Sequence, residues 1–199
     1  TRPDCLPDEV LDLCARVNRE KPVWLELGLQ TIHEDTAVFI RRGYPLSVFT
    51  QAVYALAERN IPVVVHIILG LPGESRETVL RTIDYLNRLP IQGVKLQLLH
   101  VLSDSDLADL YRAGEYTPLE KEEYLTLVGD CIAHLRADIV LHRLTGDGDK
   151  NTLLAPLWSL RKRDVLNHLH RYLKENHIRQ GMSCKIDLSV IYNKPKDVL

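Results

Sequence analysis

Short apolar runs alternate with longer amphipathic segments through the first 113 residues, and this rhythm constrains the fold more than any other feature of the chain. The runs at residues 23–30, 63–69 and 94–99 have the length and composition of strands. Between and after them, helices are expected at residues 34–42, 46–59, 75–89 and 104–113. Strand–helix units of this kind assemble into parallel sheets. The sequence therefore predicts an α/β fold.

The rhythm changes after Tyr116. A long amphipathic helix is expected at residues 119–135, followed by a short strand at 139–142, a Gly- and Asp-rich loop at 145–150 and a helix at 161–177. We therefore expect three parts: an α/β part at residues 1–115, a mainly helical extension with one short strand at 116–180, and a basic tail at 181–199.

The two faces of each expected strand differ in character. Successive side chains on a strand point to opposite faces, and in all three strands one face is wholly aliphatic. The aliphatic face should contact the helices of a parallel sheet. The opposite face carries Glu26, Gln30, His66, Lys95 and Gln97. Polar groups in one phase on three strands favour a lumen that admits water or a polar ligand. A Glu26–Lys95 ion pair with His66 bonded nearby, as part of a satisfied core, is the alternative.

Composition excludes several classes of protein. A net charge of -2, with 45% hydrophobic and 26% charged residues, is typical of a soluble globular domain. No apolar run approaches the roughly 18 to 20 residues that span a bilayer, so we expect a cytoplasmic protein without a membrane partner. Cys5, Cys14, Cys131 and Cys184 are too widely spaced for a CxxC pair, and reduced thiols are expected. Met182 is the only methionine, so we expect a piece of a longer protein.

Charge is distributed unevenly along the chain. Residues 1–160 hold 16 Lys and Arg against 23 Asp and Glu, whereas residues 161–199 hold 9 against 4. This asymmetry indicates an anionic partner for the C-terminal segment, and a solvated basic helix face is the alternative.

Four sequence runs, taken in order, resemble a known family. They are ELGLQTIHEDTAVFIRRGY at residues 26–44, HIILGLPGES at 66–75, VKLQLLHVLSDSDL at 94–107 and HRLTGDGDKNTLLAPLW at 142–158. Together they resemble the radical S-adenosylmethionine (SAM) superfamily, and more narrowly the uncharacterised YhcC-type proteins, which carry a radical SAM core like that of the Elongator catalytic subunit. The opening residues 1–11 resemble the segment that leaves the third barrel strand in that family.

The resemblance implies the C-terminal half of a partial (β/α)6 TIM-like barrel, with parallel strands four to six, plus a mainly helical extension. It also implies SAM and a [4Fe–4S] cluster, which cleaves SAM reductively to a 5′-deoxyadenosyl radical. The family holds that cluster in a CxxxCxxC loop after the first strand. The four cysteines here do not match that spacing, so this chain is expected to hold no metal ligand and to be inactive alone.

The resemblance also assigns roles to individual residues. The SAM pocket would be lined by Glu26, Gln30, Arg42, His66, Ile68, Gly70, Leu98 and Leu99. The Gln30 amide would contact the ribose or methionine portion of SAM, and Arg42 would pair with the methionine carboxylate, because a guanidinium binds carboxylates bidentately. Ile68 would pack on the adenine. Lys95, Gln97 and His100 would face the substrate.

Three functional readings remain open at this point. The first is a part of a radical SAM enzyme whose substrate is unknown, with RNA or a protein as candidates. The second is an RNA- or protein-binding α/β module without catalysis, which would not require the polar strand face. The third is a conventional barrel enzyme that uses Glu26 and His66 as acid and base, which a pH–rate profile would reveal.

Overall fold

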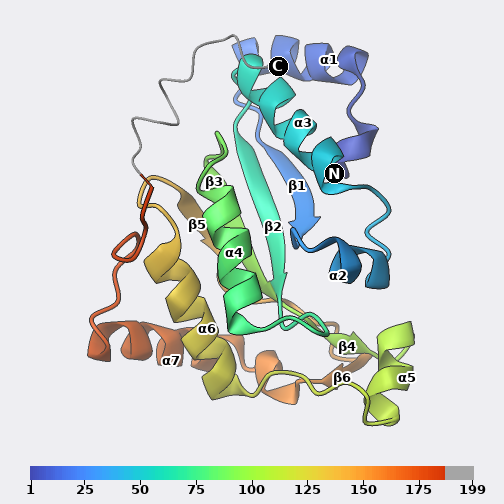
Figure 1. Cartoon of the computed structure of the whole chain (residues 1–199), viewed down its shortest axis with the longest axis vertical. Coiled ribbons are helices and arrows are strands. Elements are labelled where there is room, and N and C mark those ends of the chain that lie inside the picture. The colour runs from blue at the N-terminus through green and yellow to red at the C-terminus, as the bar shows by residue number, and fades with distance from the viewer. Residues whose placement is uncertain (187–199) are drawn as a thin grey trace.

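The computed structural model describes residues 1–186 of the chain and confirms the predicted α/β fold with a parallel sheet (Figure 1). The main sheet has the strand order β1-β2-β3-β5, and all three pairings are parallel. These strands are β1 Leu25–Gln30, β2 Val63–Leu69, β3 Gly93–Leu98 and β5 Val140–Arg143. A second, two-stranded antiparallel sheet joins β4 Val101–Leu102 to β6 Leu153–Ala155.

Helices account for most of the remaining described chain. They are α1 Asp8–Glu20, α2 Glu34–Phe39, α3 Leu46–Glu58, α4 Arg76–Leu86, α5 Asp106–Arg112, α6 Lys121–His134 and α7 Lys162–Glu175, with short 3-10 turns at Pro3–Cys5 and Leu157–Leu160. In Figure 1 the strands β1 and β2 point towards the end of the molecule where β4, β6, α5 and α7 lie. The C-terminal segments therefore gather at the carboxyl ends of the strands.

Several elements differ from the sequence expectation, and one expected strand joins the main sheet. The strand expected at residues 139–142 is β5, and it extends the main sheet beside β3. Helix α1 and strands β4 and β6 were not predicted. Most apolar side chains of α1 are exposed and only Leu11 is buried, while β4 and β6 have two and three residues. Helix α2 ends at Phe39, before the predicted residue 42, because Arg41 adopts a positive φ of 52°.

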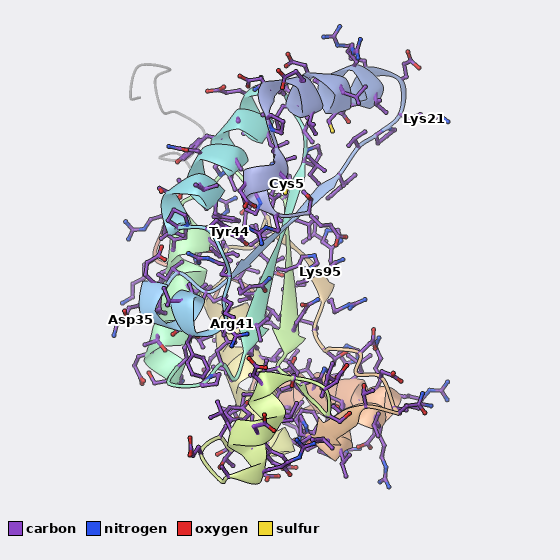
Figure 2. All side chains as sticks on the ribbon, turned by 90° about the vertical axis from the view of Figure 1, so that its right-hand side faces the viewer. Cys5, Lys21, Asp35, Arg41, Tyr44 and Lys95 are labelled. Atoms are coloured by element: carbon purple, nitrogen blue, oxygen red, sulfur yellow. The ribbon has the colours of Figure 1, made fainter. Side chains whose placement is uncertain are left out.

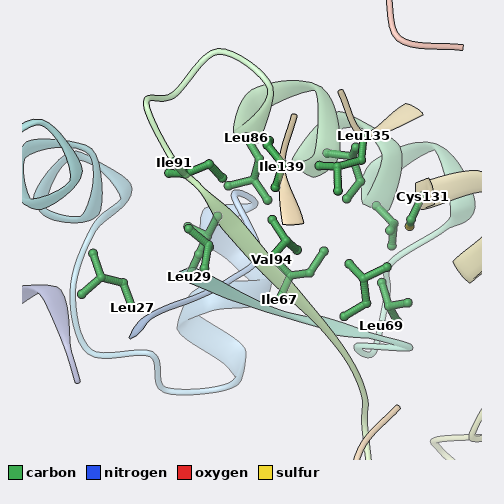
Figure 3. Packing of buried hydrophobic residues seen from close by; sticks show 14 of the residues in the cluster. Leu27, Leu29, Ile67, Leu69, Leu86, Ile91, Val94, Cys131, Leu135 and Ile139 are labelled. Carbon is green, nitrogen blue, oxygen red and sulfur yellow. The ribbon is translucent and has the colours of Figure 1, made fainter. Parts of the chain in front are cut away.

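The aliphatic strand face forms the core, as its alternation predicted. Leu27, Leu29, Ile67 and Val94 are at most 1% exposed. They pack in one cluster with side chains of α3, α4 and α6, and Figure 3 shows several of these contacts from close by, with Leu86 of α4 among them. The helices cover this face, so the opposite face of the sheet carries the polar row.

That opposite face is concave. Trp24 directly precedes β1, and its ring lies 5.5 Å from the ring of His142 on β5, in an edge-to-face contact. Four strands in a flat sheet would place the outer two about 14 Å apart. His142 leans over Gly93 of β3, where a Cβ atom would lie 2.5 Å from its ring, and so reaches Trp24. The cavity lined by β1 and β2 makes this face concave.

Candidate functional site

A cavity of about 490 Å³ lies on the concave face of the sheet, at β1 and β2. Such crevices near the carboxyl ends of parallel strands are where α/β folds bind ligands. The structure brings six of the eight predicted pocket residues to its walls: Glu26, Gln30, Arg42, His66, Ile68 and Leu99.

Gln30 has the strongest signature of a ligand contact. Its Oε1 atom is buried and has no hydrogen-bond partner among residues 1–186. The residue adopts a positive φ of 65°, and the register with β2 shifts between Gly28 and Gln30. A buried unpaired acceptor costs about 1 to 3 kcal/mol, so this atom is suited to accept a hydrogen bond from a bound molecule.

Glu26, His66 and Lys95 form a charged cluster on the concave face. The Lys95 Nζ atom lies 2.6 Å from both carboxylate oxygens of Glu26, and the His66 Nε2 atom lies 2.7 Å from Glu26 Oε2. The hydrogen bond from Lys95 lowers the pKa of Glu26, and burial lowers the pKa of His66. These shifts favour the carboxylate form of Glu26 and the neutral imidazole of His66.

Arg42 lies in the cavity wall, but its guanidinium already has protein partners. It donates to the Thr31 carbonyl at 2.7 Å and to the Tyr44 carbonyl at 2.9 Å, and it pairs with the Glu34 carboxylate at 3.1 Å. The side chain is 1% exposed. These bonds fix the connection between α2 and α3. Pairing of Arg42 with a methionine carboxylate stays a prediction. It requires the ion pair between Arg42 and Glu34 to break.

Two predicted pocket residues lie outside the cavity. Leu98 is 5% exposed and belongs to the core on the helix-covered face. Gly70, with a positive φ of 88°, ends β2, and its carbonyl accepts a hydrogen bond from the Tyr116 hydroxyl at 2.8 Å. A Cβ atom at Gly70 would lie 3.1 Å from the Leu119 side chain, so the glycine permits close packing against the segment before α6.

The predicted substrate-side residues are divided between two places. Lys95 and the half-buried Gln97 lie on the concave face of β3. His100 lies past the end of β3, where its Nε2 atom is 3.1 Å from Ser159 Oγ. It packs under the Gly-rich loop, since a Cβ atom on Gly146 would lie 2.5 Å from its ring.

Tyr44 is a cavity residue that the sequence analysis missed. Its hydroxyl donates to the Gly28 carbonyl, and its ring lies 5.2 Å from the Arg42 guanidinium carbon. Burial raises its pKa. Figure 2 shows Tyr44 and Arg41 near one another, on the connection from α2 to α3. The signal was present in the RRGY run at residues 41–44, whose tyrosine follows the predicted Arg42 by two positions.

A second cavity, of about 590 Å³, adjoins the first. The two share Ile40, Arg41 and Leu99 as lining residues. Apart from these, the second cavity is lined largely by apolar side chains of β4 and α5, together with His100. Arg41 and Asp106 meet at its edge with 2.5 Å between Nη2 and Oδ2.

Comparison with known proteins decides the family. The sequence model of the radical SAM superfamily matches residues 1–86, and that of the Radical_SAM C-terminal domain matches residues 91–175. The chain belongs to the radical SAM superfamily. Its fold agrees with this, because it superposes on the archaeal Methanocaldococcus infernus Elp3 carrying an N-terminal deletion (1–46), with a TM-score of 0.77 and 18% identity, over 90% of this chain and 42% of that one.

Sequence relatives place this radical SAM chain among YhcC-type proteins, as predicted. It is 38% identical over 181 residues to the uncharacterized protein YtqA of Bacillus subtilis (strain 168), covering 91% of this chain and 56% of YtqA. It is 37% identical over 180 residues to YhcC of Escherichia coli (strain K12), covering 90% and 58%. The chain thus spans little more than half the length of these relatives.

A more distant relative is named for an RNA-directed activity. The chain is 21% identical over 198 residues to the tRNA uridine(34) acetyltransferase of Methanocaldococcus jannaschii (strain ATCC 43067 / DSM 2661 / JAL-1 / JCM 10045 / NBRC 100440). The match covers 98% of this chain and 36% of that protein.

The radical SAM family uses SAM and a [4Fe–4S] cluster, and the two fit this chain differently. The cavity is of a size that holds drug-sized ligands, and the unpaired Gln30 acceptor suits a ligand with hydroxyl or ammonium donors, as SAM is. The cluster does not fit: within residues 1–186 no three His, Cys, Asp or Glu side chains form a metal site. Cys131, moreover, is buried, and burial raises the pKa of its thiol.

The helices of the described chain are also informative about membranes. None of those within residues 1–186 is long and apolar enough to cross a bilayer.

Proposed function

We propose that this chain forms one wall of the SAM pocket and part of the substrate surface of a radical SAM enzyme. In that enzyme a [4Fe–4S] cluster would be held by ligands outside residues 1–186 and would supply the electron for reductive cleavage of SAM to a 5′-deoxyadenosyl radical. The observation that carries the proposal is the buried, unpaired Gln30 Oε1 atom in a polar cavity at the ends of β1 and β2. Residues 1–186 contain no group of side chains that could hold the cluster, so the proposal makes the chain inactive in isolation. A cytoplasmic location stays a prediction.

Each cavity residue has a role in this proposal. Gln30 accepts a hydrogen bond from the ribose hydroxyls or the methionine ammonium of SAM. Ile68, half-buried on β2, offers an apolar surface to the adenine, and Leu99 closes the edge of the same cavity. The chemistry comes from the bound cofactor, while this chain orients SAM and keeps water away from it.

The adjoining cavity is the proposed place of the substrate. It shares a wall with the SAM cavity, so a substrate group bound there would lie beside the cofactor. His100 lines it directly. Lys95 and Gln97, on the concave face, complete the proposed substrate side.

RNA is the proposed substrate class, on two observations. One is the similarity to a tRNA-modifying acetyltransferase, which covers almost the whole chain. The other is the solvent face of α7, where Arg163, Arg171 and Lys174 are exposed. Within residues 1–186, the ion pairs of α7 use other side chains, so these three cations are free to meet phosphates. In Figure 1, α7 lies at the end of the molecule towards which β1 and β2 point.

The SAM assignment is tested by NMR titration of the chain with SAM, which detects weak binding. We expect shifts of the Gln30 and Ile68 amides, and a loss of affinity of about tenfold in Gln30→Ala, because one hydrogen bond to a polar ligand is worth about 1.4 kcal/mol. Gln51→Ala, at an exposed position of α3, is the matched control and should bind as the wild type does. A wild-type spectrum unchanged by SAM would overturn the assignment.

Two further measurements test the remaining parts. In the first, the chain is reconstituted with iron and sulfide and then given dithionite and SAM. No 5′-deoxyadenosine is expected. Its formation would contradict the proposal that the cluster ligands lie outside residues 1–186. For RNA, the triple variant Arg163→Glu, Arg171→Glu, Lys174→Glu should bind a tRNA more weakly than the wild type does. Its affinity should also depend less steeply on salt. Equal salt slopes for the variant and the wild type would rule out α7 as the RNA surface.

The Glu26–His66 contact, at 2.7 Å, favours a second candidate function, conventional acid–base catalysis. Its weakness is that Lys95 holds Glu26 ionised, which leaves the carboxylate unsuited to act as an acid. Turnover that needs neither SAM nor iron, with a bell-shaped pH profile abolished in Glu26→Gln, would favour this candidate over the first.

A further inference from the structure

Glu26, His66 and Lys95 stand on three adjacent strands, and the register explains how they meet. His66 lies opposite Gly28 of β1 on one side and opposite Lys95 of β3 on the other. Glu26 lies two residues before Gly28 on the same face of β1, and its carboxylate reaches the His66 ring at 2.7 Å. Lys95 reaches across β2 to the same carboxylate. The three groups therefore form a chain of hydrogen bonds over the concave face.

The donors and acceptors in these hydrogen bonds determine which atoms carry the protons. Lys95 Nζ is 2.6 Å from both oxygens of Glu26, so the carboxylate is ionised and acts only as an acceptor. The His66 Nε2 atom, 2.7 Å from Glu26 Oε2, must then be the donor. In a neutral imidazole only one nitrogen carries hydrogen, so His66 Nδ1 has a free lone pair.

The free nitrogen is available to a ligand. His66 lines the cavity that also contains Gln30 Oε1, and the imidazole is about one-quarter exposed. Within residues 1–186, Nε2 is the only ring nitrogen of His66 that makes a hydrogen bond. The cavity therefore offers two acceptors, one from β1 and one from β2, and a ligand with two adjacent hydroxyl donors matches them.

We propose that Lys95 and Glu26 are positioning residues that set the tautomer of His66, so that His66 Nδ1 accepts a hydrogen bond from a ribose hydroxyl. The identity of the ligand rests on the proposed function, since SAM carries a ribose diol. The tautomer itself is a property of the chain alone. A cluster that only stabilises the sheet would have no such effect on ligand binding.

The first arm of the test measures the tautomer by ¹⁵N NMR of the histidine side chains at pH 8. The chain has 8 histidines, and the signals of His66 are assigned by their absence in His66→Asn. We expect the Nε2–H form in the wild type. In Glu26→Gln the amide no longer enforces that form, so a mixture with the Nδ1–H form is expected. An Nδ1–H form in the wild type overturns the inference.

The second arm measures SAM affinity in a double-mutant cycle. Asn at residue 66 places a side-chain oxygen near the position of Nδ1, so His66→Asn should keep most of the affinity, whereas His66→Ala should lose about tenfold. Glu26→Gln and Lys95→Met should weaken binding in the wild type but have little effect in the His66→Asn background, because the tautomer no longer matters there. His177→Asn, at an exposed positive-φ position that Asn tolerates, is the control.

The outcomes separate this inference from the proposed function. If SAM binds and His66→Ala has wild-type affinity, the inference fails and the proposed function stands. If SAM leaves the wild-type spectrum unchanged, the proposed function fails and, with it, the ribose assignment. Equal losses from Glu26→Gln in both backgrounds would show a purely structural role for the cluster and would also overturn the inference.

Discussion

A Cβ atom on Gly28 would lie 2.7 Å from Gln30 Nε2, so the missing side chain at one residue makes room for the amide of the other. The two residues are next neighbours on the concave face, on either side of the register shift that ends β1. The Tyr44 hydroxyl donates a hydrogen bond to the Gly28 carbonyl. The glycine of the ELGLQ run, residues 26–30, thus sets the position of the Gln30 amide.

Gly28→Ala is expected to move the Gln30 amide without unfolding the chain. The atom that must shift is the far end of a flexible side chain, and Gly28 does not have a positive φ, so stability should change by less than about 1 kcal/mol. SAM affinity should fall about as much as in Gln30→Ala. Urea denaturation and the NMR titration measure the two effects. Wild-type affinity in Gly28→Ala would show that the amide position does not matter for binding.

Arg136 is expected to be the most destabilising single cation to remove. It is 2% exposed and donates to the carbonyls of Asn87 and Ile91 while pairing with Asp138 at 2.9 Å. Arg136→Met should therefore cost about 3 kcal/mol, measured by urea denaturation. Arg112→Met is the matched control: its pair with Asp109 is exposed, and a change within about 0.5 kcal/mol is expected. Similar losses in both variants would contradict this account.

Stability is expected to fall as the pH drops below about 6.5. Burial lowers the folded-state pKa of both His66 and His100 from their ordinary value of 6.5, so the unfolded chain binds more protons below that pH. The stability due to their neutral forms is complete above 6.5 and is lost as pH falls towards the folded pKa values.

Denaturation midpoints in urea at pH 7.5, 6.5 and 5.5 test this dependence. The acid-induced loss should be smaller in His66→Asn than in the wild type. Burial also raises the pKa of Glu74. Because Glu74 is present in both chains, its contribution to the pH dependence of stability cancels in the comparison. An identical pH dependence of the two chains would contradict the assignment to His66.

The thiols should react in the order of their exposure. Cys5 is exposed, while Cys131 is fully buried in the core and its pKa is raised by that burial. Because the thiolate is the reactive form, iodoacetamide at pH 8 should label Cys5 quickly and Cys131 only after unfolding. Mass spectrometry of digested samples, with and without urea, measures the labelling. Early labelling of Cys131 in the native chain would be inconsistent with this packing.

The fold was predictable from sequence where periodicity was strong. Two rows of side chains on residues 25–30, 63–69 and 94–98 were distinguished correctly, because alternation on a strand is a local property. Helix α1 was not predicted, since it buries one leucine and its register depends on packing against the rest of the chain. Strand β6, with three residues, is defined by its pairing with β4 and not by its own sequence.

The candidate site was predictable only in part. The shared phase of Glu26, His66 and Lys95 placed them on one face, and the structure brings them within hydrogen-bond distance. The partners of Arg42 could not be anticipated: which acceptors a guanidinium finds depends on how the connection from α2 to α3 folds back. The family resemblance assigned Gly70 to the pocket, yet its carbonyl accepts a hydrogen bond from Tyr116, a residue 46 positions away.

The contact between Trp24 and His142 gives the spacing of the outer strands an optical readout. The two rings meet across the concave face, so the environment of the Trp24 indole reports how far β1 and β5 lie from each other. Protonation of a neighbouring imidazole quenches indole emission, and the other tryptophan, Trp158, lies elsewhere, bonded to the Leu119 carbonyl. Fluorescence of a Trp158→Phe chain would therefore reveal whether a ligand spreads or tightens the half-barrel as it binds.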